Sequence, residues 1–392
     1  MVKLSQPHAP EASPSRIELA DVVRQFASEY TKQHSPMPSA KRALQDIADC
    51  CTAALGGRRY RCDDCQESFW QYHVCRNRAC PKCSGDLTRK WLKKRQAELL
   101  PCRYFHAVAT VPAELRPWFR REQKLFYGLL MQVAAESVKE LCTRKRYLGG
   151  LPGILAVLHT WNGRLEYHPH VHLLITGGGT RLDGEHWEPA RGDYLVPVTV
   201  LSKRIAAQFR DRLRRKRPDL FAQIPCAVWK REWVSFLKPY GVGNDAVLGY
   251  LSRYVYRTAI SNARILSMDR THVTFRWKDR QRQQWQTVRL SGVEFLRRFL
   301  QHVLPRGFHR VRYYGLWHPS QRVLAGRVWV LLTLSAGAPA GQVSFFQVLT
   351  EVIEPNDWPG EARLERPRSI DCPYCGSDQT HCIDELPRRG VP

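Results

Sequence analysis

The sequence predicts an α+β fold, with a small cysteine-rich module ahead of the main domain. Strand-like segments lie at residues 104–111, 154–161 and 170–178, and stretches with apolar residues at helical spacing lie around them. Cysteines are concentrated instead between residues 50 and 86. A length of 392 residues, 43% of them hydrophobic, is enough for two or three domains and excludes a wholly disordered chain.

The elements follow from local patterns along the chain. Helices are expected over 16–33, 39–50, 86–99, 113–142, 203–217 and 245–260. The alternation over 272–290 suggests a hairpin. The expected segments are an N-terminal helical arm (1–49), a cysteine-rich module (50–100), the main domain (101–265), a C-terminal accessory region (266–365) and a tail (366–392).

The charge balance points to a polyanionic partner. The chain has 61 Lys and Arg against 36 Asp and Glu, a formal net charge of +25, which favours nucleic acid or an anionic membrane. The longest apolar stretch, around 328–334, is too short to span a bilayer, and the N-terminus lacks a signal peptide. We therefore expect a cytoplasmic protein with no membrane partner. Its thirteen cysteines then indicate metal or catalysis rather than disulfides.

Two C-x2-C pairs, 14 residues apart, predict a structural zinc site. Each pair presents two sulfurs to one tetrahedral Zn²⁺ ion, so the expected ligands are Cys62, Cys65, Cys80 and Cys83. Cys50, Cys75 and His73 are alternatives, either for a second ion or as substitutes in the first. Arginines in the same module, among them Arg76 and Arg78, are expected to contact phosphates.

A second cysteine motif lies in the tail. Cys372-x2-Cys375, with His381 and Cys382, is compatible with a small zinc site of its own. Incidental cysteines in a disordered tail explain it equally well.

The sequence HPHVH at 168–172 predicts a second kind of metal site. On a strand, His168, His170 and His172 lie on the same face. If the preceding loop is centred between residues 164 and 165, His159 lies opposite His170, where Cβ atoms are about 5 Å apart. A tighter turn at 162–163 would instead place Glu166 there. The predicted ligands are His159, His170 and His172. They suit Mg²⁺ or Mn²⁺ when the substrate adds phosphate oxygens, although imidazoles alone also bind Zn²⁺ or Ni²⁺.

Residues 247–259 predict a helix that carries two candidate nucleophiles. Tyr250 and Tyr254 are four residues apart and so lie one turn apart on one flank, beside the pair Arg253 and Arg257. Aromatic residues at this spacing usually belong to a core. Next to a metal and a basic surface, however, a phenol is a plausible nucleophile towards a phosphodiester, and the two arginines are expected to bind DNA.

Taken together, these motifs resemble a known family. CRNR-x-CPKC (75–83), YFHAVATVP (104–112), HTW…HPHVH and YLSRY (250–254) occur in the order found in the rolling-circle transposases of the insertion sequence 91 family. These belong to the HUH superfamily of single-strand endonucleases, named for His–hydrophobic–His, here 170–172. The resemblance covers about residues 40–320. The H-x10-H-x-H interval is also similar to that of conjugative relaxases.

The resemblance implies a fold and a chemistry. The fold is an N-terminal zinc-binding domain followed by an HUH endonuclease domain, with a central antiparallel sheet flanked by helices. The chemistry is rolling-circle DNA transposition by metal-dependent nicking of single-stranded DNA and strand transfer through a 5′-phosphotyrosine, with Tyr250 and Tyr254 as nucleophiles.

The resemblance also implies the partners. These are single-stranded DNA at the transposon ends and at the target, in the bacterial cytoplasm near the nucleoid. No G-x4-G-K-[ST] motif is present, so a host helicase and replication machinery are expected, and no small-molecule cofactor. A plasmid replication initiator or relaxase would share this chemistry. A non-catalytic zinc-finger DNA-binding protein would bind DNA without cutting it, and a hydrolase of another polyanion such as RNA is a more distant alternative.

Overall fold

The computed structural model describes nine parts of the chain, which belong to two compact units. The described residues are 17–83, 99–181, 184–242, 247, 249–250, 254–255, 257–279, 282–335 and 370–388. The first unit comprises chain segments 1–84, 260–300 and 360–392, and the second comprises 85–259 and 301–359. The predicted cysteine ligands therefore lie in the first unit, and the predicted histidines and tyrosines lie in the second.

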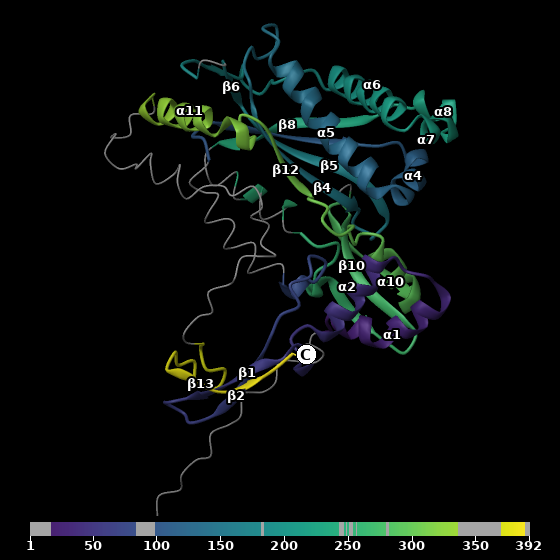
Figure 1. Ribbon diagram of the computed structural model, residues 1–392, viewed down its shortest axis with the longest axis vertical. Coiled ribbons are helices and arrows are strands. Elements are labelled where there is room, and N and C mark those ends of the chain that lie inside the picture. Colours follow the sequence, from purple (N-terminus) through teal and green to yellow (C-terminus); the bar gives the residue numbers. More distant parts are fainter. Residues whose placement is uncertain are drawn as a thin grey trace, which may run out of the picture. The chain divides into compact units, whose positions relative to one another are not determined.

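The second unit is built on a five-stranded antiparallel sheet with the order β12-β4-β5-β3-β8 (Figure 1). The strands are β3 (Arg103–Thr110), β4 (Gly153–Trp161), β5 (Tyr167–Thr176), β8 (Val234–Val242) and β12 (Val311–Gly315). The central strands β4 and β5 are almost completely buried, because other elements cover both of their faces. This sheet confirms the predicted α+β class and the central antiparallel sheet.

One face of the sheet is covered by two long helices, α5 (Gln123–Cys142) and α6 (Val198–Lys216) (Figure 1). Phe126 and Phe209 pack there with Ala107, Leu158 and Leu173 from the strands in one hydrophobic core. Ion pairs at the surface also link the two helices: Arg204 pairs with Glu140, and Arg212 pairs with Glu136. The basic helix predicted over 203–217 is confirmed as part of α6.

The opposite face of the same strands has its own smaller core. Because side chains alternate along a strand, Tyr104, Leu155 and Leu174 lie on this face, where they pack with Tyr250 and Leu316. By the same alternation the histidines of β3, β4 and β5 lie on this face too. The second unit thus has its larger apolar core on one face, and carries the histidines beside a smaller apolar core on the other, here called the polar face.

The remaining elements of the second unit are short, apart from α11. They are η2 (Ala113–Leu115), α4 (Arg116–Arg121), β6 (Gly178–Thr180), β7 (Trp187–Pro189), α7 (Pro218–Gln223), α8 (Cys226–Trp229), η4 (Pro319–Gln321) and α11 (Arg322–Ser335). Among the residues that the structure describes, no helix has both the length and the hydropathy needed to cross a membrane.

In the first unit, helices pack beside a three-stranded sheet of order β11-β10-β9. Helix α1 contacts both α2 and α10, and Gly292 allows α10 to approach Phe26, since a Cβ at position 292 would lie 2.2 Å from that ring. The elements are α1 (Leu19–Gln33), α2 (Pro38–Asp49), η1 (Ala53–Leu55), η3 (Asn262–Arg264), β9 (Ile265–Met268), β10 (His272–Asp279), β11 (Gln284–Ser291) and α10 (Gly292–Leu300). The two predicted N-terminal helices and the hairpin over 272–290 are confirmed.

A second three-stranded sheet of this unit joins the two ends of the chain (Figure 1). Its order is β13-β1-β2, with β1 (Gly57–Cys62), β2 (Ser68–Tyr72) and β13 (Thr380–Leu386) all antiparallel. The C-terminal strand therefore lies beside the N-terminal hairpin, with Glu385 opposite Arg58, and the tail is part of a folded sheet.

The structure divides the chain differently from the predicted segments. The accessory region 266–365 contributes to both units: β10, β11 and α10 belong to the first, and β12 pairs with β4 in the main sheet of the second. The tail pairs with β1 instead of standing apart. Long-range strand pairing, which local sequence patterns do not encode, causes both differences. The basic helix predicted over 86–99 lies almost wholly outside the described residues.

Candidate functional site

Three histidines meet on the polar face of the main sheet. The register of β4 and β5 places His159 directly opposite His170, as predicted, and rules out the alternative in which Glu166 faces His159. The Asn162 side chain accepts hydrogen bonds from the backbone N–H groups of residues 164 and 166, and Leu165 adopts a left-handed φ of 59°. This loop fixes the register and hence the pairing of the histidines.

Hydrogen bonds determine which nitrogen each histidine of β5 can offer to a metal. Nδ1 of His170 lies 2.7 Å from the carbonyl oxygen of His168 and donates to it, so its lone pair is on Nε2. Nε2 of His172 lies 3.0 Å from Nε2 of His170, and Nδ1 of His172 lies 2.9 Å from Nε2 of His106. The two Nε2 atoms therefore face each other, while both Nδ1 atoms are held by partners.

His159 is held by the segment that carries the tyrosines. Its Nε2 donates to the backbone carbonyl oxygen of Tyr254 at 2.6 Å, which leaves the lone pair of the neutral ring on Nδ1. Burial, and then electrostatic interactions with His170, Arg310 and Arg257, lower the pKa of His159 well below its ordinary value. His159 is thus neutral, as a metal ligand must be.

The donor set of these histidines fits one divalent ion. A ligand atom from each of His159, His170 and His172 lies within 4.8 Å of the other two. Metal–nitrogen bonds of about 2.0–2.1 Å require ligand atoms about 3–4 Å apart, so small movements are enough to bring all three to one ion. His168, which was expected on the same face, has a different partner: its Nδ1 lies 2.9 Å from the guanidinium of Arg116.

Both predicted tyrosines lie next to the histidines, in different surroundings. The ring of Tyr254 is partly exposed, and its centroid is 4.2 Å from that of His172 and 6.0 Å from that of His159. The ring of Tyr250 is fully buried, 4.8 Å from Tyr254 and 5.4 Å from His106. The two phenols therefore do share one flank, and Tyr254 is the nearer of the two to the predicted metal ligands.

The Tyr250 phenol is enclosed. Its Oη is buried and has no hydrogen-bond partner among the described residues. Burial, and then the neighbouring phenols of Tyr254 and Tyr240, raise the pKa of Tyr250 well above its ordinary value. In this conformation Tyr250 is a protonated core residue that no substrate can reach.

A buried arginine holds the backbone that follows the tyrosines. Arg310 donates from one terminal nitrogen to the carbonyl oxygen of Val255 at 2.6 Å and from the other to that of Arg257 at 3.2 Å. His159 also donates to the carbonyl oxygen of Tyr254. Side chains from β4 and from the residue before β12 therefore bind three carbonyl groups within residues 254–257. This arrangement fixes Tyr254 against the histidines.

Sequence reasoning missed His106 and Arg310. His106 lies on β3 with its side chain on the polar face, is 5% exposed, and contacts the ring of His172. The motif YFHAVATVP already contained it, and strand alternation could have placed it on the face opposite Phe105 and Ala107. No sequence signal marks Arg310, because its partners are backbone carbonyls more than fifty residues away.

The cysteines form two clusters, and neither is the set of four that the sequence favoured. Cys50, Cys75, Cys80 and Cys83 form one, here called the N-terminal cluster, and Cys62, Cys65, Cys372 and Cys375 form the other, here called the split cluster. The predicted grouping of Cys62 and Cys65 with Cys80 and Cys83 is therefore corrected. The alternative ligands Cys50 and Cys75 do enter a cluster, whereas His73, His381 and Cys382 enter neither.

The β1–β2 hairpin explains the correction. The first C-x2-C pair lies at its turn, and the later cysteines follow the far end of β2. Five residues at about 3.3 Å per residue separate these two ends by roughly 17 Å, which is too far for one ion. In the N-terminal cluster, Sγ of Cys83 lies 3.6 Å from that of Cys50 and 3.5 Å from that of Cys75. Neighbouring sulfurs of a tetrahedral zinc site are about 3.8 Å apart, given a Zn–S distance of about 2.3 Å.

Comparisons with known proteins match these features. A family model described as "Transposase zinc-binding domain" matches residues 22–111, and one described as "Putative transposase" matches residues 153–323. A protein named "Putative transposase y4qJ", from Sinorhizobium fredii, is 35% identical over 387 residues, which cover 94% of this chain and 95% of that protein. The chain belongs to the IS91 family of transposases. No solved structure matches it.

A second relative of this transposase is named for its insertion sequence. It is "Transposase for insertion sequence element IS801", from Pseudomonas savastanoi pv. phaseolicola, which is 29% identical over 293 residues, or 68% of this chain and 67% of that protein. The zinc-binding match includes the whole N-terminal cluster, and the second match includes the three histidines and both tyrosines. The N-terminal cluster is thus a structural zinc site of a transposase zinc-binding domain.

The arginines that were predicted to bind DNA differ in exposure. Arg76 is exposed and has a left-handed φ of 56°, whereas Arg78 is half-buried, and burial lowers the pKa of Arg78. Arg257 is exposed, and its carbonyl accepts from Arg310. Arg253 lies outside the described residues. Arg76 and Arg257 are therefore the two whose side chains the structure shows to be accessible.

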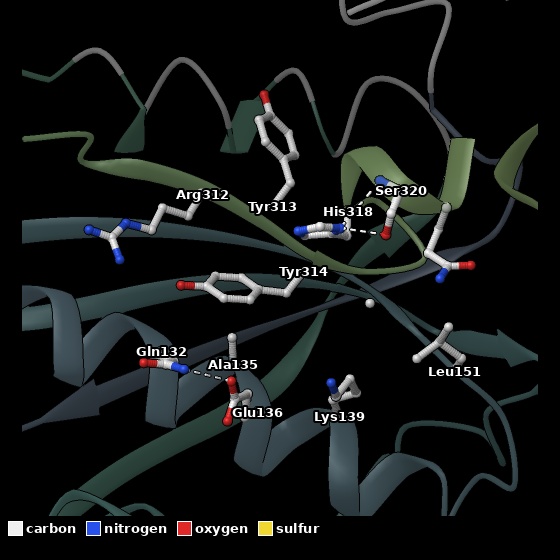
Figure 2. A pocket seen from close by; sticks show the side chains of 12 residues that line it. Gln132, Ala135, Glu136, Lys139, Leu151, Arg312, Tyr313, Tyr314, His318 and Ser320 are labelled. Carbon is white, nitrogen blue, oxygen red and sulfur yellow. Dashed lines mark hydrogen bonds between the residues drawn. The ribbon is translucent and has the colours of Figure 1, made fainter. Parts of the chain in front are cut away.

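A pocket of about 540 Å³ lies elsewhere on this transposase, between α5 and β12 (Figure 2). Its lining includes Glu136 and Lys139 from α5 and Arg312 and Tyr314 from β12. None of the predicted site residues lines it. The chemistry is therefore expected at the histidine face and not in this pocket.

Replacing a thiol of the N-terminal cluster should release zinc and destabilise the first unit. For Cys80→Ser we expect the loss of one zinc ion per chain and a lower melting temperature, because the metal contributes folding free energy directly. Metal analysis and thermal melting measure both effects. Cys226→Ser, at an exposed cysteine outside both clusters, is the matched control. Unchanged zinc content in Cys80→Ser would contradict the assignment.

Proposed function

We propose that this transposase cuts and rejoins single-stranded DNA at the ends of its element through tyrosine side chains, in rolling-circle transposition. The observation that carries the proposal is the position of Tyr254, whose ring lies 4.2 Å from the ring of His172 beside the three-histidine cluster. A phenol, a metal-binding cluster and a basic chain are the groups that attack on a phosphodiester requires.

The histidines form the metal site of this proposal. Nε2 of His170 and His172 and Nδ1 of His159 are the atoms that would hold a divalent ion. When bound, an ion such as Mg²⁺ or Mn²⁺ would withdraw charge from the oxygens of the scissile phosphate. The phosphate oxygens of the substrate are the ligands that suit hard cations of this kind, whereas imidazoles alone also bind Zn²⁺ or Ni²⁺.

The tyrosines carry out the transfer. The Tyr254 phenol loses its proton and its oxygen bonds to phosphorus. The bond to the 3′-oxygen then breaks, which leaves a 5′-phosphotyrosine and a free 3′-hydroxyl. Tyr250, or that hydroxyl, accepts the strand in a second transfer at the target. Tyr250 is enclosed, so it can act only after its surroundings open, and we infer that Tyr254 acts first.

The basic residues and outside partners complete the proposal. Exposed arginines such as Arg76 and Arg257, together with Arg78 and Arg253, supply salt-sensitive phosphate contacts that position the strand. A host helicase and replication machinery would supply unwinding, for which the sequence carries no nucleotide-binding motif.

A covalent-adduct assay tests this function. Full-length protein with Mg²⁺ or Mn²⁺ is incubated with labelled single-stranded DNA that spans the ends of the element, and the products are run on a denaturing gel. The wild type should give a slow adduct, Tyr254→Phe should give none, and Tyr250→Phe should keep the first adduct. Loss of joined product in Tyr250→Phe would assign the second transfer to Tyr250, and its retention would assign that transfer to the 3′-hydroxyl. Tyr194→Phe, at an exposed tyrosine, is the control.

Two outcomes would revise the proposal. An adduct that persists in Tyr254→Phe and vanishes in Tyr250→Phe would reverse the order of the tyrosines. No adduct from any form, with tight DNA binding and full zinc content, would favour a non-catalytic DNA-binding role.

His106 should act by orienting His172. The 2.9 Å bond between Nε2 of His106 and Nδ1 of His172 holds that ring with its Nε2 towards His170. Loss of such a supporting bond weakens metal affinity by about 10–100-fold. His106→Ala should therefore weaken Mn²⁺ binding by that factor, as measured by electron paramagnetic resonance, and His106→Asn should restore part of it. Equal Mn²⁺ affinity in His106→Ala and the wild type would show that His106 only packs.

Arg310 should act by fixing the tyrosine segment. Arg310→Met leaves the carbonyls of Val255 and Arg257 without its donors, which should cost about 1–3 kcal/mol of unfolding free energy. It should also slow adduct formation more than Mn²⁺ binding, because the ligands stay in place. Arg306→Met, at an exposed arginine four residues away, is the control. A variant that loses stability while its adduct rate stays at the wild-type level would limit Arg310 to a structural role.

A further inference from the structure

We propose that the two ends of the chain share one zinc ion, bound by Cys62 and Cys65 from the N-terminal hairpin and by Cys372 and Cys375 from the C-terminal segment. The matched zinc-binding domain ends at residue 111, so the last two ligands lie far outside it. The protein would then hold two structural zinc ions, and the second would cross-link two segments more than three hundred residues apart.

Strand pairing brings the four cysteines together. In the antiparallel register of β1 and β13, Cys62 lies opposite Thr380 and Arg61 lies opposite His381. The turn after β1 therefore lies next to the segment before β13 (Figure 1). Sγ of Cys62 is 3.6 Å from that of Cys375, and Sγ of Cys65 is 3.6 Å from that of Cys372. These separations match the value of about 3.8 Å for neighbouring sulfurs around tetrahedral zinc.

The two C-x2-C segments have the same backbone conformation. The backbone N–H of Gln66 donates to the carbonyl of Cys62 at 3.0 Å, and that of Gly376 donates to the carbonyl of Cys372 at 2.8 Å. The residue after each second cysteine is left-handed, with φ of 61° at Gln66 and 77° at Gly376. Each segment thus presents two sulfurs in the same way. Glycine adopts a left-handed conformation more readily than other residues, and Gln66 adopts it all the same.

A second hydrogen bond repeats as well. The backbone N–H of Cys62 donates to the carbonyl of Glu67 at 3.0 Å, and that of Cys372 donates to the carbonyl of Ser377 at 2.7 Å. Two matching half-sites that face each other at bonding distance make a four-thiolate centre. Thiolates select a soft or borderline ion, and Zn²⁺ is the one that takes four of them in a tetrahedral structural site.

Among the described residues, the C-terminal strand β13 has few other interactions that hold it on β1. Of β13, only Thr380 is buried, and most of its other side chains are exposed, so β13 contributes little apolar burial to hold it on β1. Besides the backbone ladder, the described contacts include the ion pair of Arg58 with Glu385 and a 2.9 Å contact between Asp63 and His381, and partly exposed pairs of this kind add little stability. Binding of zinc to both segments supplies the missing free energy.

Cobalt substitution of the full-length protein tests the proposal. Thiolate-to-cobalt charge-transfer absorption reports cysteine ligands only, so metal at the histidine cluster does not contribute to it. The double variant Cys372→Ser/Cys375→Ser should lose half of this absorption and one zinc ion per chain. The single variant Cys382→Ser, at an exposed cysteine on β13 outside the cluster, should lose neither.

Hydrogen exchange gives a second readout. In Cys372→Ser/Cys375→Ser the backbone amides of residues 380–386 should lose protection, while the amides of α1 and α2 keep theirs, which shows that the rest of the unit is folded. Charge-transfer absorption and zinc content equal to the wild type in this variant would overturn the proposal. So would the finding of Cys62–Cys375 and Cys65–Cys372 disulfides in protein purified under reducing conditions.

Discussion

The register of β4 against β5 is the constraint on which the rest of the second unit depends. Side chains alternate along both strands, so a slip of β5 by one residue would exchange its faces: His170 and His172 would enter the core beneath α5 and α6, and Leu173 would move to the side of His159. The apolar face opposes such a slip because it buries its residues completely. The loop around Asn162 opposes it too, since its hydrogen bonds fix the loop length.

The same register also ties the predicted metal ligands to the proposed nucleophile. His159 uses Nε2 to hold the carbonyl of Tyr254 and has Nδ1 for an ion, so one ring contacts both groups. Arg310 holds the next carbonyls from a position just before β12, which pairs with β4. The position of the tyrosine segment is therefore set by the strands that set the histidines. Its two phenols receive unequal environments, one open beside His172 and one enclosed behind His106.

Local patterns predicted what depends on local geometry. Strand alternation was enough to place His170 and His172 on one face, and a loop-length argument gave the pairing of His159 with His170 as one of two alternatives, between which the structure decides. Helical spacing was enough to bring Tyr250 beside Tyr254. None of these patterns could find Arg310, whose role arises only because β12 returns to the edge of a sheet formed 150 residues earlier. His106 is an intermediate case, because its strand was recognised but its partner depended on how β3 pairs with β5.

The cysteines show most clearly that local sequence patterns do not predict long-range contacts. A C-x2-C pair encodes half of a tetrahedral site, and nothing in its own sequence says which other half completes it. The shorter separation along the chain favours Cys62 and Cys65 with Cys80 and Cys83, but the hairpin between them is stiff and places the two pairs at its opposite ends. Each pair must then take ligands from whatever lies at its own end of the hairpin. At the far end of β2 the added ligands are Cys50, which precedes β1, and Cys75. At the turn, the added ligands are Cys372 and Cys375, which lie in the segment before β13. The pairing of strands therefore decides the metal sites, and it makes the C-terminal segment part of the zinc-binding module.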